Sequence, residues 1–398
     1  MRISSSMIYE RGVAGIQARQ ADLLKTQQQL STGRRVLTPA DDPVASAQAL
    51  QLTQTIDVNA RQRTNRDYAQ GQLQVAESTI AQASDLLQRV REIAVAAGDA
   101  SYTDQERASL ADELKGIRSE LLGLANSTDS EGQYLFAGYQ GTTPPFVENA
   151  GAVQYLGDDG QRLVQAGPTR QIALNLSGAD VFQRIRNGNG SFVWGAAAAN
   201  TGTGILGPGT VDDATLLTGD SYQINFSVVG GVTTYDVVDT TTSTTVLAAQ
   251  PYDGVVGSIQ FDGMRLELKG APADGDSFTV DPSTDQSMFQ TVDNLISALG
   301  GPGGVPLANQ LGVSLSDIDQ AIDKILAQRA MVGSRLNEID GLNTLNEDLA
   351  VQYQDQHSKL VDVDYAKAAS DLTQQQTSLQ AAQQSFVRIT GLSLFDYF

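Results

Sequence analysis

The chain has 398 residues, a formal net charge of −20, one histidine and no cysteine. Two or three domains are expected at this length. The composition excludes nucleic-acid binding through a basic face, disulfides and thiol chemistry, and the lone His357 leaves little for a histidine-based metal site.

The amino-terminal segment predicts a helix with one narrow apolar stripe, from about Ser5 to Thr32. A stripe this thin buries little surface, so the helix should be marginal by itself. Gly33 offers a carboxy-terminal stop. Asp42 before Pro43 is typical of a helix start, which makes a cap a better interpretation of Asp41–Asp42 than a metal pair. The stripe residues, seven apart, are Tyr9, Ile16, Leu23, Leu30 and Leu37.

A second helix is predicted from Val44 to Ala97, without interior proline. Large residues spaced by seven alternate with small ones, a pattern typical of a closely packed coiled coil. Thr103–Glu106 matches a capping box that opens a third helix ending near Asn126. The large seam residues are Leu73, Ile80, Leu87 and Ala94, and the small ones are Ala76, Ala83, Val90 and Ala97.

Short alternating runs replace the helical pattern from about residue 140 to 282. They predict an inserted antiparallel β-domain, with strands at 161–164, 222–229, 233–238, 258–261, 264–268 and 277–280. The Asp-Gly pairs at 159–160, 253–254 and 262–263 predict hairpins. The charge-free run 187–211, rich in Gly and Asn, predicts a loop or strands and no membrane span.

Helical periodicity returns at Asp285 and is interrupted by a Gly-Pro segment. Ser314–Asp317 matches a further capping box. The helix after it should pair with helix 44–97, with Asn346 as a polar seam residue that fixes the register. The seam is Ile318, Ile325, Val332, Ile339, Asn346, Tyr353 and Leu360, with Leu315, Ile322 and Leu336 as companions.

The carboxy-terminal tail repeats the thin stripe of the first helix, at Tyr365, Leu372, Leu379 and Phe386. Residues 1–66 hold nine Lys or Arg and five Asp or Glu, whereas residues 315–398 hold six and twelve. Opposite charge favours pairing of the two ends. The predicted fold is α+β: a long antiparallel helical coiled-coil rod built from both termini, with an inserted antiparallel β-domain. Its parts are terminal helices (1–43 and 361–398), a helical rod domain (44–139 and 283–360) and the insert (140–282).

No enzymatic chemistry is predicted. Gly202, Gly204 and Gly207 match a dinucleotide-loop spacing, but no buried strand precedes them, so a flexible loop is the better interpretation. The pairs Asp274/Asp276 and Asp362/Asp364 lack the remaining ligands of a calcium loop, which favours solvated turn and helix-start residues. No catalytic, cofactor-binding or metal-binding residue is assigned.

Motifs at both ends resemble the bacterial flagellin superfamily. They are Gln29–Val36 with Pro39–Pro43, YLFAGY at 134–139, and the tail from Asp364 to Tyr397. Asp-Asp-Pro at 41–43, in place of the Asp-Asp-Ala usual in flagellins, is similar to the hook-associated protein 3 family, which lies at the hook–filament junction. The resemblance is weak across the β-insert.

The resemblance implies a structural, extracellular role at that junction. It implies a ring of subunits between the first hook-associated junction protein and flagellin, without nucleic acid, membrane insertion or cofactor. It also implies export in the unfolded state through the flagellar type III apparatus, with an export chaperone on the tail. Residues 1–8 lack the apolar segment of a secretory signal, which agrees with export without a cleaved leader. The terminal helices would be disordered before assembly.

The residue roles follow from the same resemblance. Assembly contacts would be made by Ile16, Leu23, Leu30, Leu372, Leu379 and Phe386. Chaperone or tube contacts would be made by Phe386, Ile389, Leu392, Leu394 and Phe395. Three alternatives stay open: a flagellin filament subunit, a flagellin-like rod carrying a binding (adhesin) module, and a rod carrying an enzyme.

Overall fold

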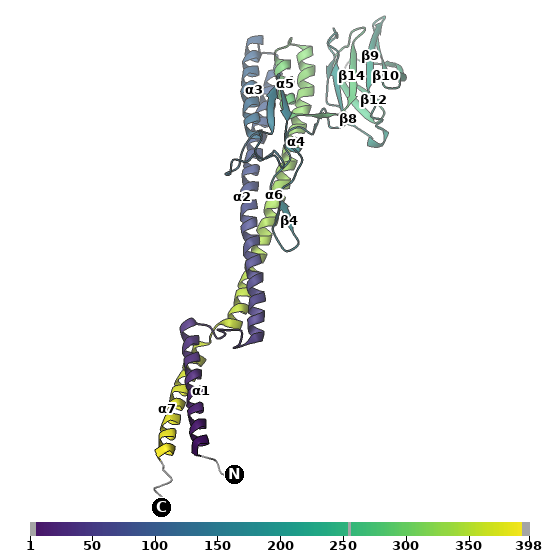
Figure 1. Cartoon of the computed structure of the whole chain (residues 1–398). Coiled ribbons are helices and arrows are strands. Elements are labelled where there is room, and N and C mark those ends of the chain that lie inside the picture. Colours follow the sequence, from purple (N-terminus) through teal and green to yellow (C-terminus); the bar gives the residue numbers. More distant parts are fainter. Residues whose placement is uncertain (1–4, 254–255, 392–398) are drawn as a thin grey trace, which may run out of the picture. The chain divides into compact units, whose positions relative to one another are not determined.

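The computed structural model describes residues 5–253 and 256–391, and the chain forms two compact units (Figure 1). The terminal unit comprises residues 1–64 and 341–398, and the central unit comprises residues 65–340. Two long helices, α2 (Pro43–Ala97) and α6 (Val305–Val361), contribute residues to both units. Helical ends around an inserted antiparallel β-domain confirm the predicted fold class.

In the terminal unit, α1 (Ser5–Thr32) and α7 (Tyr365–Gly391) lie side by side and antiparallel, as predicted (Figure 1). The rings of Tyr9 and Phe386 meet with centroids 5.3 Å apart at one end of the pair. At the other end, α1 stops because Gly33 adopts a left-handed φ of 72°. Leu37, predicted as the last stripe residue, lies beyond α1 in the connecting loop.

In the central unit, α2 and α6 run antiparallel, which confirms their predicted pairing. Arg91 pairs with Asp319 at 2.6 Å, and Arg329 pairs with Glu77 at 2.7 Å. All eight predicted seam residues of α2 are buried, as are Ile318, Ile325, Val332 and Ile339 of α6. The companion positions were wrong: Ser314, Ala321 and Gln328 are buried, whereas Leu315, Ile322 and Leu336 are half-buried.

The capping boxes had different outcomes. Thr103 caps α3 (Asp104–Ala125) with both reciprocal hydrogen bonds present, as predicted. Ser314–Asp317 was wrongly interpreted as a helix start, because α6 already begins at Val305 and Ser314 and Asp317 are buried inside it. Pro306 did not prevent this start, since proline is tolerated in the first turn of a helix.

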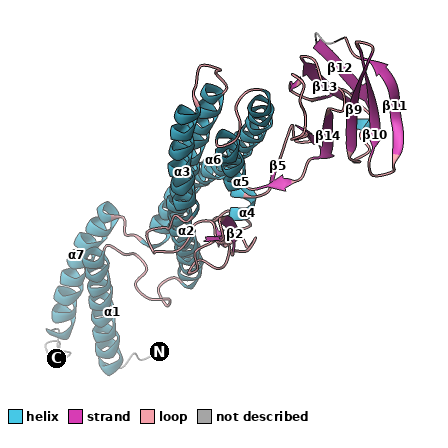
Figure 2. Ribbon diagram, turned by 90° about the horizontal axis from the view of Figure 1, so that it is seen from above, coloured by secondary structure: helices cyan, strands magenta, loops and turns pink. Residues whose placement is uncertain are grey.

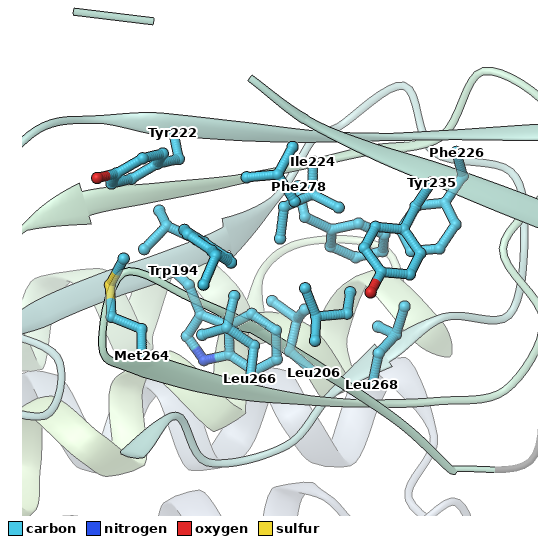
Figure 3. Packing of buried hydrophobic residues seen from close by; sticks show 14 of the residues in the cluster. Trp194, Leu206, Tyr222, Ile224, Phe226, Tyr235, Met264, Leu266, Leu268 and Phe278 are labelled. Atoms are coloured by element: carbon cyan, nitrogen blue, oxygen red, sulfur yellow. The ribbon is translucent and has the colours of Figure 1, made fainter. Parts of the chain in front are cut away.

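The β-insert contains a sandwich of two antiparallel sheets, formed by residues 192–282 (Figure 2). One sheet has the order β11-β10-β9-β14-β6, and the other has β12-β13-β7, with β8 also pairing with β13. Side chains such as Trp194, Leu266 and Phe278 fill the space between the sheets (Figure 3). The strands are β6 (Phe192–Ala196), β7 (Ile205–Leu206), β8 (Thr210–Val211), β9 (Tyr222–Val229), β10 (Val232–Asp239), β11 (Thr244–Pro251), β12 (Val256–Phe261), β13 (Met264–Lys269) and β14 (Ser277–Pro282), with a 3-10 turn η1 (Ala214–Leu216).

One of the three predicted hairpins forms. Asp262 and Gly263 join β12 to β13 with φ values of 44° and 77°, as a two-residue turn with two positive φ angles requires. Asp159-Gly160 instead lies in a loop, where the Asp158 carboxylate accepts the Gly160 N–H at 2.7 Å. Asp253 precedes residues outside the described part, and the strands on either side, β11 and β12, belong to different sheets.

The segment around Gly202 is hydrogen-bonded, so its interpretation as a flexible loop was wrong. Asp276 is buried and accepts the N–H groups of Thr201 and Gly202 at 2.8 and 3.0 Å. Asp276 is therefore a structural acceptor and no solvated turn residue. Asp364 does lie at a helix start, where it accepts the Ala366 N–H at 3.0 Å.

Between α3 and the sandwich, a small region of short strands packs around aromatic rings. Phe136, Phe146, Phe182 and Phe289 contact one another there. The predicted return to helix at Asp285 comes slightly later, because residues 285–286 form a strand and Ser287 caps α5. The elements are β1 (Phe146–Asn149), β2 (Ala152–Tyr155), β3 (Leu163–Gln165), β4 (Gln171–Ala173), α4 (Gly178–Phe182), β5 (Ile185–Arg186), β15 (Asp285–Gln286) and α5 (Met288–Leu299).

Candidate assembly surface

The stripes of α1 and α7 are only partly buried after the two helices have paired. Six predicted assembly residues are only half-buried: Ile16, Leu23, Leu30, Leu372, Leu379 and Phe386. One close contact is made by the Phe386 ring, which covers the backbone of Gly12. A Cβ at Gly12 would lie 2.5 Å from that ring, so glycine is needed there unless the ring moves.

The terminal unit has almost no apolar core in its described residues. Its buried apolar side chains are only Val or Ala: Val36, Ala45, Ala49, Val361 and Ala368. Many apolar side chains of valine size or larger are exposed, including Val351 at 71% and Val44 at 67%. The other exposed ones are Met7, Tyr9, Leu24, Leu50, Val58, Leu345, Tyr365, Val387 and Ile389.

The loop between α1 and α2 binds the end of α6. The Arg35 backbone N–H donates to the Val361 carbonyl at 2.7 Å, and its guanidinium donates to the Leu360 carbonyl at 2.7 Å. The same guanidinium pairs with Asp42 at 3.0 Å. Val363 returns a bond to the Gly33 carbonyl at 2.9 Å. The two chain ends are therefore joined by backbone hydrogen bonds at this loop.

Asp42 caps the start of α2, as predicted, whereas Asp41 holds the loop that precedes this helix. Asp42 accepts the Ala45 N–H at 3.0 Å at the start of α2, and this bond and Arg35 lower the pKa of the carboxyl. Asp41 pairs with Lys25 of α1 at 2.7 Å and accepts the Thr38 N–H at 2.7 Å. Lys25 and Thr38 together hold the pKa of Asp41 well below its usual range.

In the described part of the terminal unit, the ion pair between the two chain ends lies on α2 and α6 and not, as we expected, on α1 and α7. No ion pair joins α1 to α7 in the described residues; the pair between the two chain ends in this unit is Arg63 of α2 with Glu347 of α6, at 3.5 Å. Asn346 is buried in the seam, and its carbonyl accepts from Asn59 at 3.4 Å. Polar side chains of α2 and α6 thus contact each other at defined positions in this part of the unit, as a residue that fixes the register would.

The predicted chaperone or tube residues lie mostly outside the described part. Leu392, Leu394 and Phe395 fall in residues 392–398, of which nothing is described. Ile389 is 55% exposed on α7. Sequence reasoning missed the roles of Gly12 and Arg35. The signal for Gly12 was a glycine inside a predicted helix, three residues after the stripe residue Tyr9.

In the part of the chain that the structure describes, no group of three His, Asp or Glu side chains could hold a metal ion. Among the same residues, no helix is long and apolar enough to cross a membrane.

Comparison with known proteins identifies the family. Residues 3–141 match the bacterial flagellin N-terminal helical region, and residues 315–398 match the flagellin C-terminal helical region. Residues 196–282 match the D2-like domain of flagellar hook-associated protein 1, which covers most of the sandwich.

Relatives agree over nearly the whole chain. The flagellar hook-associated protein 3 of Escherichia coli is 29% identical over 401 residues, covering 99% of both chains. The crystal structure of flagellar hook-associated protein 3 from Legionella pneumophila is 31% identical, with a TM-score of 0.74 over 78% of this chain and 98% of that one. The structure of FlgL from Xanthomonas campestris is 35% identical, with a TM-score of 0.70 over 77% of this chain and 99% of that one.

These matches confirm the role expected from the terminal motifs: a structural part of the external flagellum, assembled with other flagellar components, and no enzyme. The chain belongs to the flagellar hook-associated protein 3 (FlgL) family, the structural proteins of the hook–filament junction.

Proposed function

We propose that this protein joins hook to filament by completing the packing of its terminal unit against neighbouring subunits. The observation that carries the proposal is the contrast in that unit between five buried apolar residues, all Val or Ala, and eleven exposed apolar residues of valine size or larger. Burying one Leu or Val side chain on assembly would contribute about 1.5–3 kcal/mol. Neighbouring subunits would therefore supply the core that the terminal unit lacks.

The half-buried stripes are the proposed contact residues. Leu23 and Leu379 each keep one side free after α1 and α7 have paired. A second helix pair can pack onto that free side. We propose that the neighbours are further copies of this chain in a ring, the first hook-associated junction protein on the hook side, and flagellin on the filament side.

The same weakness supports export in an unfolded state. Segments 1–43 and 361–398 gain little from packing in the monomer, so we propose that they are disordered before assembly. Segments 44–139 and 283–360 would form the helical rod domain, and 140–282 the insert. An export chaperone would cover the apolar tail, with Phe386 and Ile389 among its contacts, and no leader would be cleaved.

The test is Leu379→Asp, with Gln380→Asp as the matched control, since Gln380 is an exposed neighbour on the same helix. A charge on the half-buried stripe should prevent filament attachment, whereas the control should support normal filaments. Trp194 fluorescence checks that the sandwich stays folded, because Trp194 is the chain's one tryptophan. Normal filament attachment and motility in Leu379→Asp would contradict the proposed role of the stripe.

A second experiment separates the junction from the filament alternative. Antibody against this chain should label a band at the distal end of the hook. Labelling along the whole filament would instead favour a filament subunit.

A further inference from the structure

The sandwich is attached to the helices of the central unit by a narrow connection of two chain segments. β5 leaves the helices and β15 returns to them, and the two pair as antiparallel strands (Figure 2). Asn187 extends the pairing: its N–H donates to the Thr284 carbonyl at 3.1 Å, and its side chain accepts the Thr284 N–H at 2.8 Å. A connection of two short strands allows rotation unless other contacts prevent it.

Asp317 holds this connection to α6. It is 4% exposed, and its two carboxylate oxygens accept from both segments: the Gly188 N–H at 2.7 Å and the Gln286 amide at 3.0 Å. Burial raises the pKa of Asp317, because taking the charged carboxylate out of water is unfavourable. The two hydrogen bonds are therefore made at a cost in desolvation. One side chain of α6 thus fixes the outgoing and the returning chain together.

Asn309 holds the sandwich itself at a second point. Its side chain is on α6, eight residues before Asp317, about 12 Å along a helix. Its carbonyl oxygen accepts the Leu206 N–H at 2.7 Å, and its amide donates to the Gly204 carbonyl at 3.1 Å. These are backbone groups at the free edge of β7, so Asn309 satisfies a sheet edge as a neighbouring strand would.

Between the two points, α6 and the sandwich are closely packed. A cavity of only about 10 Å³, the size of one water, is lined by Trp194 and Gly209 on one side and by Val313 and Ser316 of α6 on the other. Asn309 is 5% exposed, so both polar side chains are buried in the contact. Removing one partner of a buried hydrogen bond leaves the other unsatisfied and costs its desolvation.

We infer that Asn309 and Asp317 form a two-point clamp on α6 that sets the orientation of the β-sandwich on the helices. The neighbouring acid Asp319 has no part in it, since it pairs with Arg91 of α2. The clamp is independent of the terminal unit, so its failure and the failure of the assembly proposal give different results.

The experiment measures the orientation directly in the full chain. Because the chain has no cysteine, Ser119→Cys on α3 and Thr245→Cys on β11, both exposed, accept spin labels at two defined sites. Pulsed electron paramagnetic resonance then gives the distribution of distances between helices and sandwich. The parent should give one narrow distribution, and Asn309→Ala with Asp317→Leu should broaden it at least twofold.

Two controls make the result specific. Asp319→Ala removes an acid from the same helix and should leave the distribution narrow, and so should Asp317→Asn, whose amide oxygen still accepts from Gly188. Unchanged Trp194 fluorescence shows that the sandwich is folded. A broad distribution in the parent, or a narrow one in the double variant with a folded sandwich, would overturn the clamp.

Discussion

The central unit and the terminal unit are built from similar amphipathic helices but bury very different residues. In the central unit, Leu73, Ile80 and Leu87 are fully buried between helices, and the sandwich has an aromatic core of its own. In the terminal unit, the buried apolar residues are Val and Ala, and the larger ones are half-buried or exposed. Helical periodicity alone therefore does not measure stability. Stability depends on how many large side chains in each turn are buried against another helix.

The largest expected effect is on the free energy of unfolding when one leucine in each unit is replaced by alanine. Leu87→Ala in the central unit should lower the free energy of unfolding by about 2–5 kcal/mol, because it empties a fully buried site. Leu24→Ala in the terminal unit, where the side chain is exposed, should change it by less than about 0.5 kcal/mol. Urea denaturation followed by circular dichroism measures both. Equal losses would mean that the units do not differ in packing as described.

A smaller effect is expected at the end of α1. Gly33 has a φ of 72°, and an added Cβ would lie 2.9 Å from the Tyr365 hydroxyl. Gly33→Ala should therefore cost about 1–2 kcal/mol in the left-handed conformation and displace α7. Because the terminal unit contributes little to the monomer, the loss should be seen as slower assembly onto hooks and not as a lower Tm. Gly116→Ala, where the added Cβ meets nothing, is the matched helix control.

The smallest expected effect concerns how stability depends on pH. The contributions of one aspartate in each unit should change with pH in opposite directions. Asp42 has a lowered pKa, so its contribution to stability is present above the ordinary value of 3.8 and is lost as the pH falls through the lowered native pKa. Asp317 has a raised pKa, so its contribution is present below 3.8 and is lost as the pH rises through the raised native pKa.

The two aspartates can be compared through their amide variants. As the pH falls from 7 toward 3.8, wild type should gain stability relative to Asp317→Asn, measured by Trp194 fluorescence. Relative to Asp42→Asn, wild type should lose helicity only below 3.8. The same sign for both variants would contradict the opposite environments of the two carboxyls.

Much of the helical architecture could be predicted, because helix starts, stops and seams are local signals. Ser5–Thr32, the Thr103 capping box and the Asp262-Gly263 turn follow from a few adjacent residues. The wrong helix start has a physical cause. Ser314–Asp317 looks like a capping box, but the Asp317 carboxylate accepts hydrogen bonds from the distant residues Gly188 and Gln286.

The candidate site was predictable only in part. The stripes at Leu23 and Leu379 are visible as heptads, and the pairing of the chain ends follows from them. The contact of Phe386 with Gly12 and the bonds from Arg35 to the end of α6 join residues more than 300 positions apart, for which spacing gives no signal. Asn309 and Asp317 look like ordinary polar helix residues until β7 and the connection are seen beside them.

The pairing of β5 with β15 has a consequence for how this family can diversify. Arg186 and Asp285 are direct antiparallel partners, so the chain leaves the helices and returns to them at neighbouring positions, about 5 Å apart. A two-residue turn can span that gap. The module between these positions is therefore joined to the helices by one covalent connection, at which evolution or an engineer can replace, enlarge or excise it while the host helices keep their register.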